Sequence, residues 1–183
     1  MSLHSFKTEG IVLKRSNFGE ADKILTIYTK NYGKIRVMAK GVRRMTSRKA
    51  GALELFNHSA LFLAKGKNLD IICEVQTINA YRRWRKDLLA IGLAYYLCEL
   101  VDKLTPDEQE NQPVFDLLQN YLAQIGILRP PTLVRDFEEK LLGELGFGVP
   151  EEFKKQPGSL KSYIESIIEK EINTPKILKQ LCG

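Results

Sequence analysis

The stretch YGKIRVMAKGVRRMTSRK, residues 32–49, joins a predicted strand to a strongly basic loop. Between residues 34 and 40 apolar and mostly cationic side chains alternate, which predicts a strand with one buried face and one solvent-facing cationic face. Gly41 then lets the backbone turn. The stretch contains no Asp or Glu. Its cations are candidate contacts for a polyanion: Lys34, Arg36, Lys40, Arg43, Arg44, Arg48 and Lys49.

A lone cationic run is as often a solvated surface as a binding site, so the charge of the whole chain matters. Residues 1–86 hold 18 Lys and Arg and 6 Asp and Glu, a net charge of +12, whereas residues 87–183 hold 10 and 16, a net charge of −6. This asymmetry favours a polyanion-binding module joined to a part with another task.

Four further strands surround the basic one, and all five fall within about 75 residues. Tight turns leave no room for crossover helices, so antiparallel pairing and a small barrel are expected. An OB-fold is the small barrel that often binds single-stranded nucleic acid, and an SH3-like barrel is the structural alternative. The other predicted strands are Thr8–Lys14, Asp22–Thr29, Leu53–Lys65 and Leu69–Ala80.

Three aromatic residues of this half are candidates for stacking on bases, although core or turn packing is the favoured interpretation for each of them individually. They are Phe18, Tyr32 and Phe56.

The chain has three cysteines, an odd number, and no two of them are in a CxxC spacing. Cys73 lies in an apolar strand pattern and Cys98 in an apolar helix pattern, so both are expected to be buried free thiols. Reduced cysteines fit a reducing compartment, and the N-terminus lacks an apolar signal core. We therefore expect a cytoplasmic protein without a membrane-spanning segment.

The second half changes to a helical period. From Asp87 to Leu104 apolar residues occur nearly all round, which is typical of a buried central helix. Asn111 is a typical N-cap for the next helix, and Gly126 closes it. Further helices are expected at residues 130–146 and 159–172, with a loop at 147–158 between them and a short last helix that starts at Thr174 and Pro175.

The segment YRRWRK, residues 81–86, lies where the strands give way to helices. Its cations could extend a basic groove or contact the acidic half, and Trp84 is expected to pack between domains. The secondary candidates for DNA contact are Arg15, Arg82, Arg83 and Arg85.

The sequence lacks a recognisable catalytic arrangement. There is no GxxxxGK[ST] phosphate loop, and neither His4 nor His58 has a partner at metal or triad spacing. Glu138, Glu139 and Glu144 fall on a predicted helix and are expected on its solvated face. We predict no active site, no metal and no cofactor.

The run TEGIVLKRSNFGEADKILTIYTKNYGKIRVMAKGVRRMTSR, residues 8–48, resembles the N-terminal domain of the bacterial RecO recombination mediators. LELF at residues 53–56 and LLGELGF at residues 141–147 are also similar to that family. Many RecO proteins carry a zinc-binding cysteine cluster after the LGF segment. This chain has GVPEEFKKQPGS there, without cysteine, so no metal is expected.

The resemblance implies an α+β fold, with an OB-fold barrel over residues 1–82 followed by an all-helical domain over residues 83–183. It also implies non-catalytic binding of single- and double-stranded DNA, annealing, and help in placing RecA on DNA coated by single-strand-binding protein. RecR and the C-terminal tail of that coating protein are the implied partners.

Two other functions stay open from the residues alone. An adaptor would capture an acidic protein tail on the helical half, for which Arg129 and Arg135 are candidates. An RNA-binding factor would use the same basic barrel, since charge alone does not separate RNA from DNA.

Overall fold

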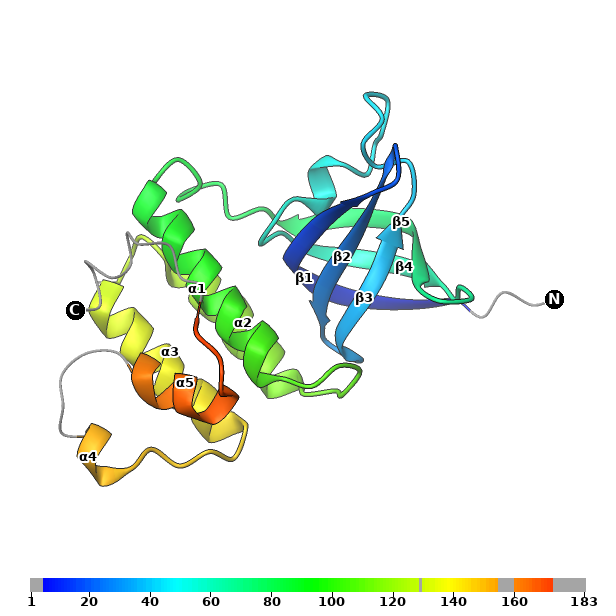
Figure 1. Cartoon of the computed structure of the whole chain (residues 1–183). Helices are drawn as coiled ribbons and strands as arrows, with labels where there is room; N and C mark the ends of the chain where they lie inside the picture. The colour runs from blue at the N-terminus through cyan, green and yellow to red at the C-terminus, as the bar shows by residue number, and fades with distance from the viewer. Residues whose placement is uncertain (1–4, 129, 155–159, 173–183) are drawn as a thin grey trace. The chain divides into compact units, whose positions relative to one another are not determined.

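A computed structural model describes residues 5–128, 130–154 and 160–172 (Figure 1). The chain divides into two compact units. The barrel unit comprises Met1–Ala80 and Pro106–Phe115, and the helical unit comprises Tyr81–Thr105 and Asp116–Gly183. The short segment after the first helix therefore belongs to the barrel unit, although it is distant from the barrel in the sequence.

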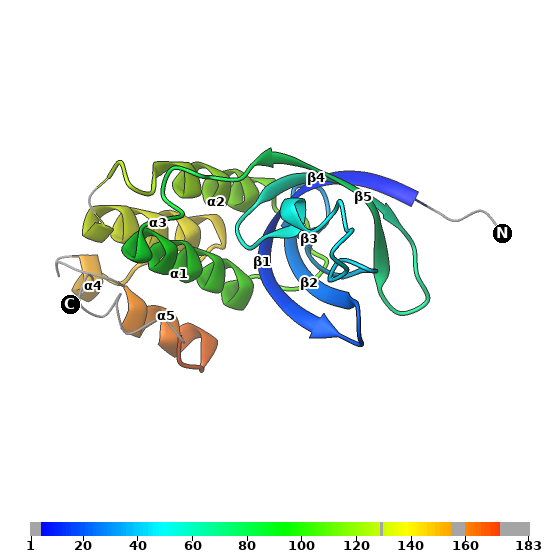
Figure 2. The same cartoon turned by 90° about the horizontal axis from the view of Figure 1, so that it is seen from above.

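The barrel is closed, with the strand order β1-β2-β3-β5-β4 and with β1 pairing with both β2 and β4 (Figure 2). This confirms the predicted five-stranded barrel followed by helices. One pair differs from the antiparallel expectation, because β3 and β5 run parallel over a short contact. The strands are β1 (Ser5–Phe18), β2 (Asp22–Thr29), β3 (Gly33–Ala39), β4 (His58–Ala64) and β5 (Asp70–Asn79).

The barrel core follows from the period-2 alternation of apolar side chains. Val37 on β3 is completely buried, as predicted for the apolar face of this strand, and Leu63 on β4 is also completely buried. The chain before β4 is not a strand, however, since a short 3-10 helix, η1 (Gly51–Leu53), precedes it. Asn57 donates a side-chain hydrogen bond to the Gly51 carbonyl at 2.8 Å and holds this turn closed.

The alternation expected for the last strand is wrong around Cys73. β5 pairs with β4 through an irregularity, in which Phe62 faces Glu74 but Leu63 faces Ile72. Cys73 is the extra residue of this bulge, and a bulge reverses the faces of the residues beyond it. Ile72 is therefore buried and Cys73 is exposed, not buried as expected.

The helical unit begins with α1 (Leu88–Leu104), whose N-cap is the Asp87 carboxylate. It continues with α2 (Gln112–Gln124), α3 (Pro130–Glu144), α4 (Glu151–Lys154) and α5 (Lys161–Ile168); the first residues of α2 belong to the barrel unit. The predicted N-cap is confirmed, because the Val114 N–H donates to the Asn111 side chain at 3.1 Å. Gly126 and Gly146 adopt positive φ at the ends of α2 and α3, as their residue type suggested.

The C-terminal part differs from the expected helices and loop. The predicted loop at 147–158 contains the short helix α4, and α5 is shorter than the predicted helix at 159–172. Glu169 ends α5 in the left-handed conformation, which breaks the helical hydrogen-bond ladder. The helix predicted from Thr174 lies outside the described residues.

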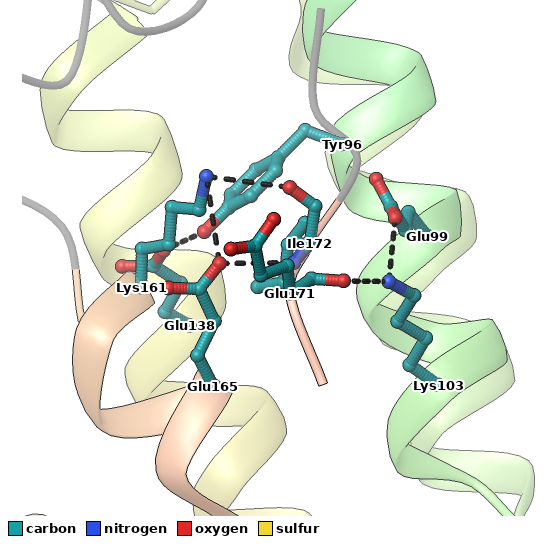
Figure 3. A network of polar contacts seen from close by, with 8 residues as sticks. All are labelled: Tyr96, Glu99, Lys103, Glu138, Lys161, Glu165, Glu171 and Ile172. Carbon is teal, nitrogen blue, oxygen red and sulfur yellow. Dashed lines mark hydrogen bonds and ion pairs between the residues drawn. The ribbon is translucent and has the colours of Figure 1, made fainter. Parts of the chain in front are cut away.

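Glu138 on α3 is completely buried, so the prediction of a solvated carboxylate is wrong. It accepts a hydrogen bond from the Tyr96 hydroxyl on α1 (Figure 3). It also accepts one from the Leu160 N–H at 2.6 Å. A buried carboxylate is retained when hydrogen-bond donors surround it. Glu138 therefore joins α1, α3 and the start of α5, which is a structural role.

Candidate nucleic-acid interface

Strand β3 presents only part of the expected cationic face. Arg36 and Lys40 are exposed, and their apolar neighbours on the opposite face are buried. Lys34 is different, because its side chain is only 11% exposed and its ammonium lies 3.2 Å from the Asp107 carboxylate. The solvent exposure expected for Lys34 is wrong, since a segment distant in the sequence covers it.

The basic loop after β3 is fixed to the β1–β2 turn by three hydrogen bonds. The Gly41 N–H donates to the Asp22 carboxylate at 2.7 Å, and the Arg43 N–H donates to the Ala21 carbonyl at 2.9 Å. The Arg43 guanidinium also donates to the Gly19 carbonyl at 3.0 Å. The loop therefore has a defined course, and Arg43 contributes to it structurally.

The remaining cations of the stretch fall into two groups. Lys49 donates to the Ile72 carbonyl at 3.1 Å, so it links the loop to β5. The other group consists of four exposed cations. None of these four forms an ion pair or a side-chain hydrogen bond with another described residue. These four, which we call the open cations, are Arg36, Lys40, Arg44 and Arg48.

The secondary candidates are divided between the two units. Arg15 on β1 lies 2.8 Å from Glu54 in an ion pair. Arg82 and Arg83 are exposed, but they belong to the helical unit. Arg85 lies over the ring of Trp84, which itself donates to the Leu122 carbonyl and so packs within the helical unit.

The three aromatic candidates differ in their solvent exposure. Phe56 is 3% exposed, so it is a core residue, whereas Phe18 is 49% and Tyr32 is 40% exposed. Tyr32 is placed by the β2–β3 turn, in which its N–H donates to the Thr29 hydroxyl at 3.1 Å and that hydroxyl donates to the Gly33 carbonyl. Tyr32 is therefore a solvent-facing ring held on a well-defined turn.

Tyr32 lines a groove of about 390 Å³ that the sequence did not reveal. Phe6 and Lys65 are the residues that sequence reasoning missed here. The predicted first strand begins at Thr8 and does not include Phe6, whereas β1 begins at Ser5. An alternation that extends back to residue 6 is the available signal. Lys65 stands next to the β4–β5 turn and had no local signal.

Of the two arginines proposed to hold a protein tail, the structure describes one. Arg129 lies outside the described residues. Arg135 donates to Glu139 at 2.5 Å, one turn along α3, and to the Phe153 carbonyl at 2.7 Å. Its guanidinium therefore holds α3 and α4 together.

His58 is buried and its Nε2 lies 3.0 Å from the Glu9 carboxylate. Burial lowers the pKa of this imidazole below its usual 6.5, which the neighbouring Glu9 only partly opposes. In the described part of the chain, no group of three or more His, Cys, Asp or Glu is arranged to hold a metal ion. No described helix has the length and apolarity that crossing a bilayer requires.

The comparisons with known proteins agree with these features. A family model described as "Recombination protein O N terminal" matches residues 1–81, and one described as "Recombination protein O C terminal" matches residues 85–153. The two matches follow one another in the order of the barrel and the helices.

Relatives named "DNA repair protein RecO" match over most of the chain. The Roseiflexus sp. protein is 42% identical over 143 residues, which cover 78% of this chain and 50% of that protein. The Symbiobacterium thermophilum protein is 39% identical over 144 residues, which cover 78% of this chain and 57% of that protein. The chain thus spans about half the length of these relatives. Both family models and these relatives show that the chain belongs to the RecO family.

Proposed function

We propose that this chain is a non-catalytic DNA-binding recombination mediator, which binds single- and double-stranded DNA and anneals complementary strands. The observation that carries the proposal is the set of open cations, Arg36, Lys40, Arg44 and Arg48, on one strand and loop of an OB-type barrel. Cations without an internal partner keep their full attraction for phosphate.

The physical character of this binding follows from the side chains. Lysine and arginine contacts to phosphate carry no base information, so affinity depends weakly on sequence and strongly on salt. The loop is held to the β1–β2 turn through Gly41 and Arg43, so the open cations of this loop extend from a fixed backbone. A fixed cationic surface loses less conformational entropy on binding than a free tail.

The family supports a wider set of proposals. We propose that this protein acts in the cytoplasm with RecR and with the C-terminal tail of single-strand-binding protein, and that it helps to place RecA on DNA. We also propose residues 1–82 as the DNA-binding domain and residues 83–183 as the domain for protein partners. No cofactor enters this proposal.

The test compares two variants with the same loss of charge. Arg36→Ala/Arg44→Ala/Arg48→Ala removes three open cations, and Lys140→Ala/Lys154→Ala/Lys170→Ala removes three exposed cations of the helical unit. Affinity for single-stranded and duplex DNA is measured across a salt series. The first variant should weaken binding and reduce the slope of log K against log salt by about 2–3, since each lost phosphate contact contributes about 0.7–0.9.

Equal binding by the two variants would exclude the open cations as the DNA site. If the unmodified chain binds a protein tail but no DNA at low salt, the adaptor function is correct instead. Competition with RNA of matched sequence decides between DNA and RNA, and tighter binding of RNA would reject the DNA proposal.

A further inference from the structure

The groove of about 390 Å³ lies beside the first half of β3 and the β4–β5 turn. Its volume is within the range of pockets that hold small organic groups. The strand-3 face and the turn between strands 4 and 5 are surfaces on which OB barrels hold oligonucleotides. The residues that line this groove include Phe6, Tyr32, Arg36, Lys65, Asp107 and Glu108.

Two aromatic rings form one side of the groove. The rings of Phe6 and Tyr32 meet edge to face, with their centroids 4.6 Å apart and their planes at 61°. Tyr32 is 40% exposed despite this contact, so the residue remains accessible to a ligand. The Lys65 ammonium lies 4.9 Å from the centroid of the Phe6 ring, which adds a cation next to the aromatic pair.

The charges of the groove are nearly balanced. Lys34 is paired with Asp107 at 3.2 Å, and Lys65 is paired with Asp70 at 2.8 Å. Two further charged residues of opposite sign, Arg36 and Glu108, line the same groove. Such a lining is unsuitable for a phosphate inside the groove, because the carboxylates repel its negative charge. It suits a neutral, flat group inside, with its phosphate near Arg36 at the open cations.

The acidic wall of the groove is a fixed part of the barrel unit. The Glu108 N–H donates to the Lys34 carbonyl at 2.8 Å, and Asp107 forms an isolated bridge with Lys34. Gly33 lies directly against the backbone of Gln109, so a side chain there would collide with it. The segment at residues 107–109 therefore lies beside the start of β3, and it lines the groove whether or not a ligand is bound.

We propose that this groove is a stacking site for one unpaired nucleobase of single-stranded DNA. The base lies against Tyr32, and its phosphate lies toward Arg36. This inference rests on the proposed function and deepens it, because it explains how a phosphate-binding surface distinguishes single strands from duplexes. Bases in a duplex are already stacked on their neighbours, whereas an unpaired base has a free face for an aromatic ring.

The test replaces the ring and keeps everything else. Tyr32→Leu removes the aromatic face, and Tyr32→Phe is the matched control that keeps it. Loss of one base–aromatic stack corresponds to roughly a 5- to 150-fold loss of affinity. We expect a loss within this range for single-stranded oligothymidine with Tyr32→Leu, little change with Tyr32→Phe, and unchanged duplex affinity for both variants.

A direct readout complements the affinities. Oligonucleotides that contain 5-iodouracil are irradiated with the unmodified chain, and the cross-linked peptides are identified by mass spectrometry. Adducts at Tyr32 or Phe6 support the proposal. Adducts confined to other residues, or equal single-strand affinities of Tyr32→Leu and Tyr32→Phe, would overturn it while the open cations remain the DNA site. If the unmodified chain binds no single-stranded DNA, both the proposed function and this site are wrong.

Discussion

The ammonium of Lys34, on strand β3, lies 3.2 Å from the carboxylate of Asp107, in the segment that follows helix α1. The lysine side chain is 11% exposed and the aspartate side chain 67% exposed. The pair therefore consists of a nearly buried cation and a largely solvated anion. It also attaches this segment to the same strand that carries Arg36.

The asymmetry of this pair predicts unequal effects of its two substitutions. Asp107→Asn removes a carboxylate 3.2 Å from a nearly buried ammonium, so we expect a loss of about 1–3 kcal/mol in the free energy of unfolding. Lys34→Met leaves a carboxylate that water still solvates, so we expect a change of less than about 1 kcal/mol. Urea denaturation of both variants measures the difference. Equal losses would show that the ion pair acts as an ordinary surface pair.

An open cation and a hydrogen-bonded cation of the same loop should respond differently when each is replaced by alanine. Arg44→Ala should lower the salt slope of DNA binding by about 0.7–0.9 and leave the unfolding midpoint unchanged. Lys49→Ala should instead lower stability by about 1 kcal/mol, because the Ile72 carbonyl loses its donor. Salt titrations and urea denaturation are run on both proteins. A stability loss with Arg44→Ala would contradict its assignment as an open cation.

The sequence predicted the features that depend on neighbours along the chain. Alternation identified the buried face of β3, and residue type identified Asn111 as an N-cap. The cationic loop was also evident, because a glycine and a run of arginines are local signals. These features follow from local periodicity and local hydrogen bonding, which one stretch of sequence contains.

The features that the sequence did not predict depend on distant contacts or on register. Lys34 is covered by Asp107, and Glu138 is buried by donors from α1 and the start of α5. Cys73 is exposed because one extra residue reverses the alternation of β5. The groove beside Tyr32 likewise needs a strand, two turns and the segment after α1 together. No pattern within a single stretch of sequence specifies contacts between such distant segments.

Two glycines with positive φ provide a test of the close approach at β3. Gly19 has φ +55°, and a methyl group added there would meet no other atom within 4 Å, so Gly19→Ala should cost only the backbone strain of about 1–2 kcal/mol. Gly33 has φ +63° and lies against the Gln109 carbonyl, so Gly33→Ala should cost about 3 kcal/mol or more. Thermal and urea unfolding compare the two. Similar costs would show that the segment after α1 yields to a side chain.

The buried carboxylate of Glu138 has an exposed neighbour on the same helix as its control. Glu138→Ala removes the acceptor for the Tyr96 hydroxyl and the Leu160 N–H, so we expect a loss of roughly 2–4 kcal/mol in the free energy of unfolding. Glu139→Ala removes only a surface pair with Arg135 and should cost less than about 1 kcal/mol. If the two losses are alike, Glu138 does not join α1 and α3 energetically.

His58 should make stability depend on pH in a defined direction. Because burial lowers its pKa below 6.5, the unfolded chain takes up the proton at a higher pH than the folded chain does. The neutral imidazole thus contributes stability above pH 6.5, and this contribution is lost as the pH falls from about 6.5 through the lower pKa of the folded state. Glu9 favours the charged ring and Lys30 opposes it, but burial is the largest effect.

The free energy of unfolding should therefore fall more steeply between pH 7 and pH 5 in the unmodified chain than in His58→Gln, in which His4 is the one remaining histidine. Parallel curves for the two proteins would show that His58 does not titrate differently in the folded and unfolded chains.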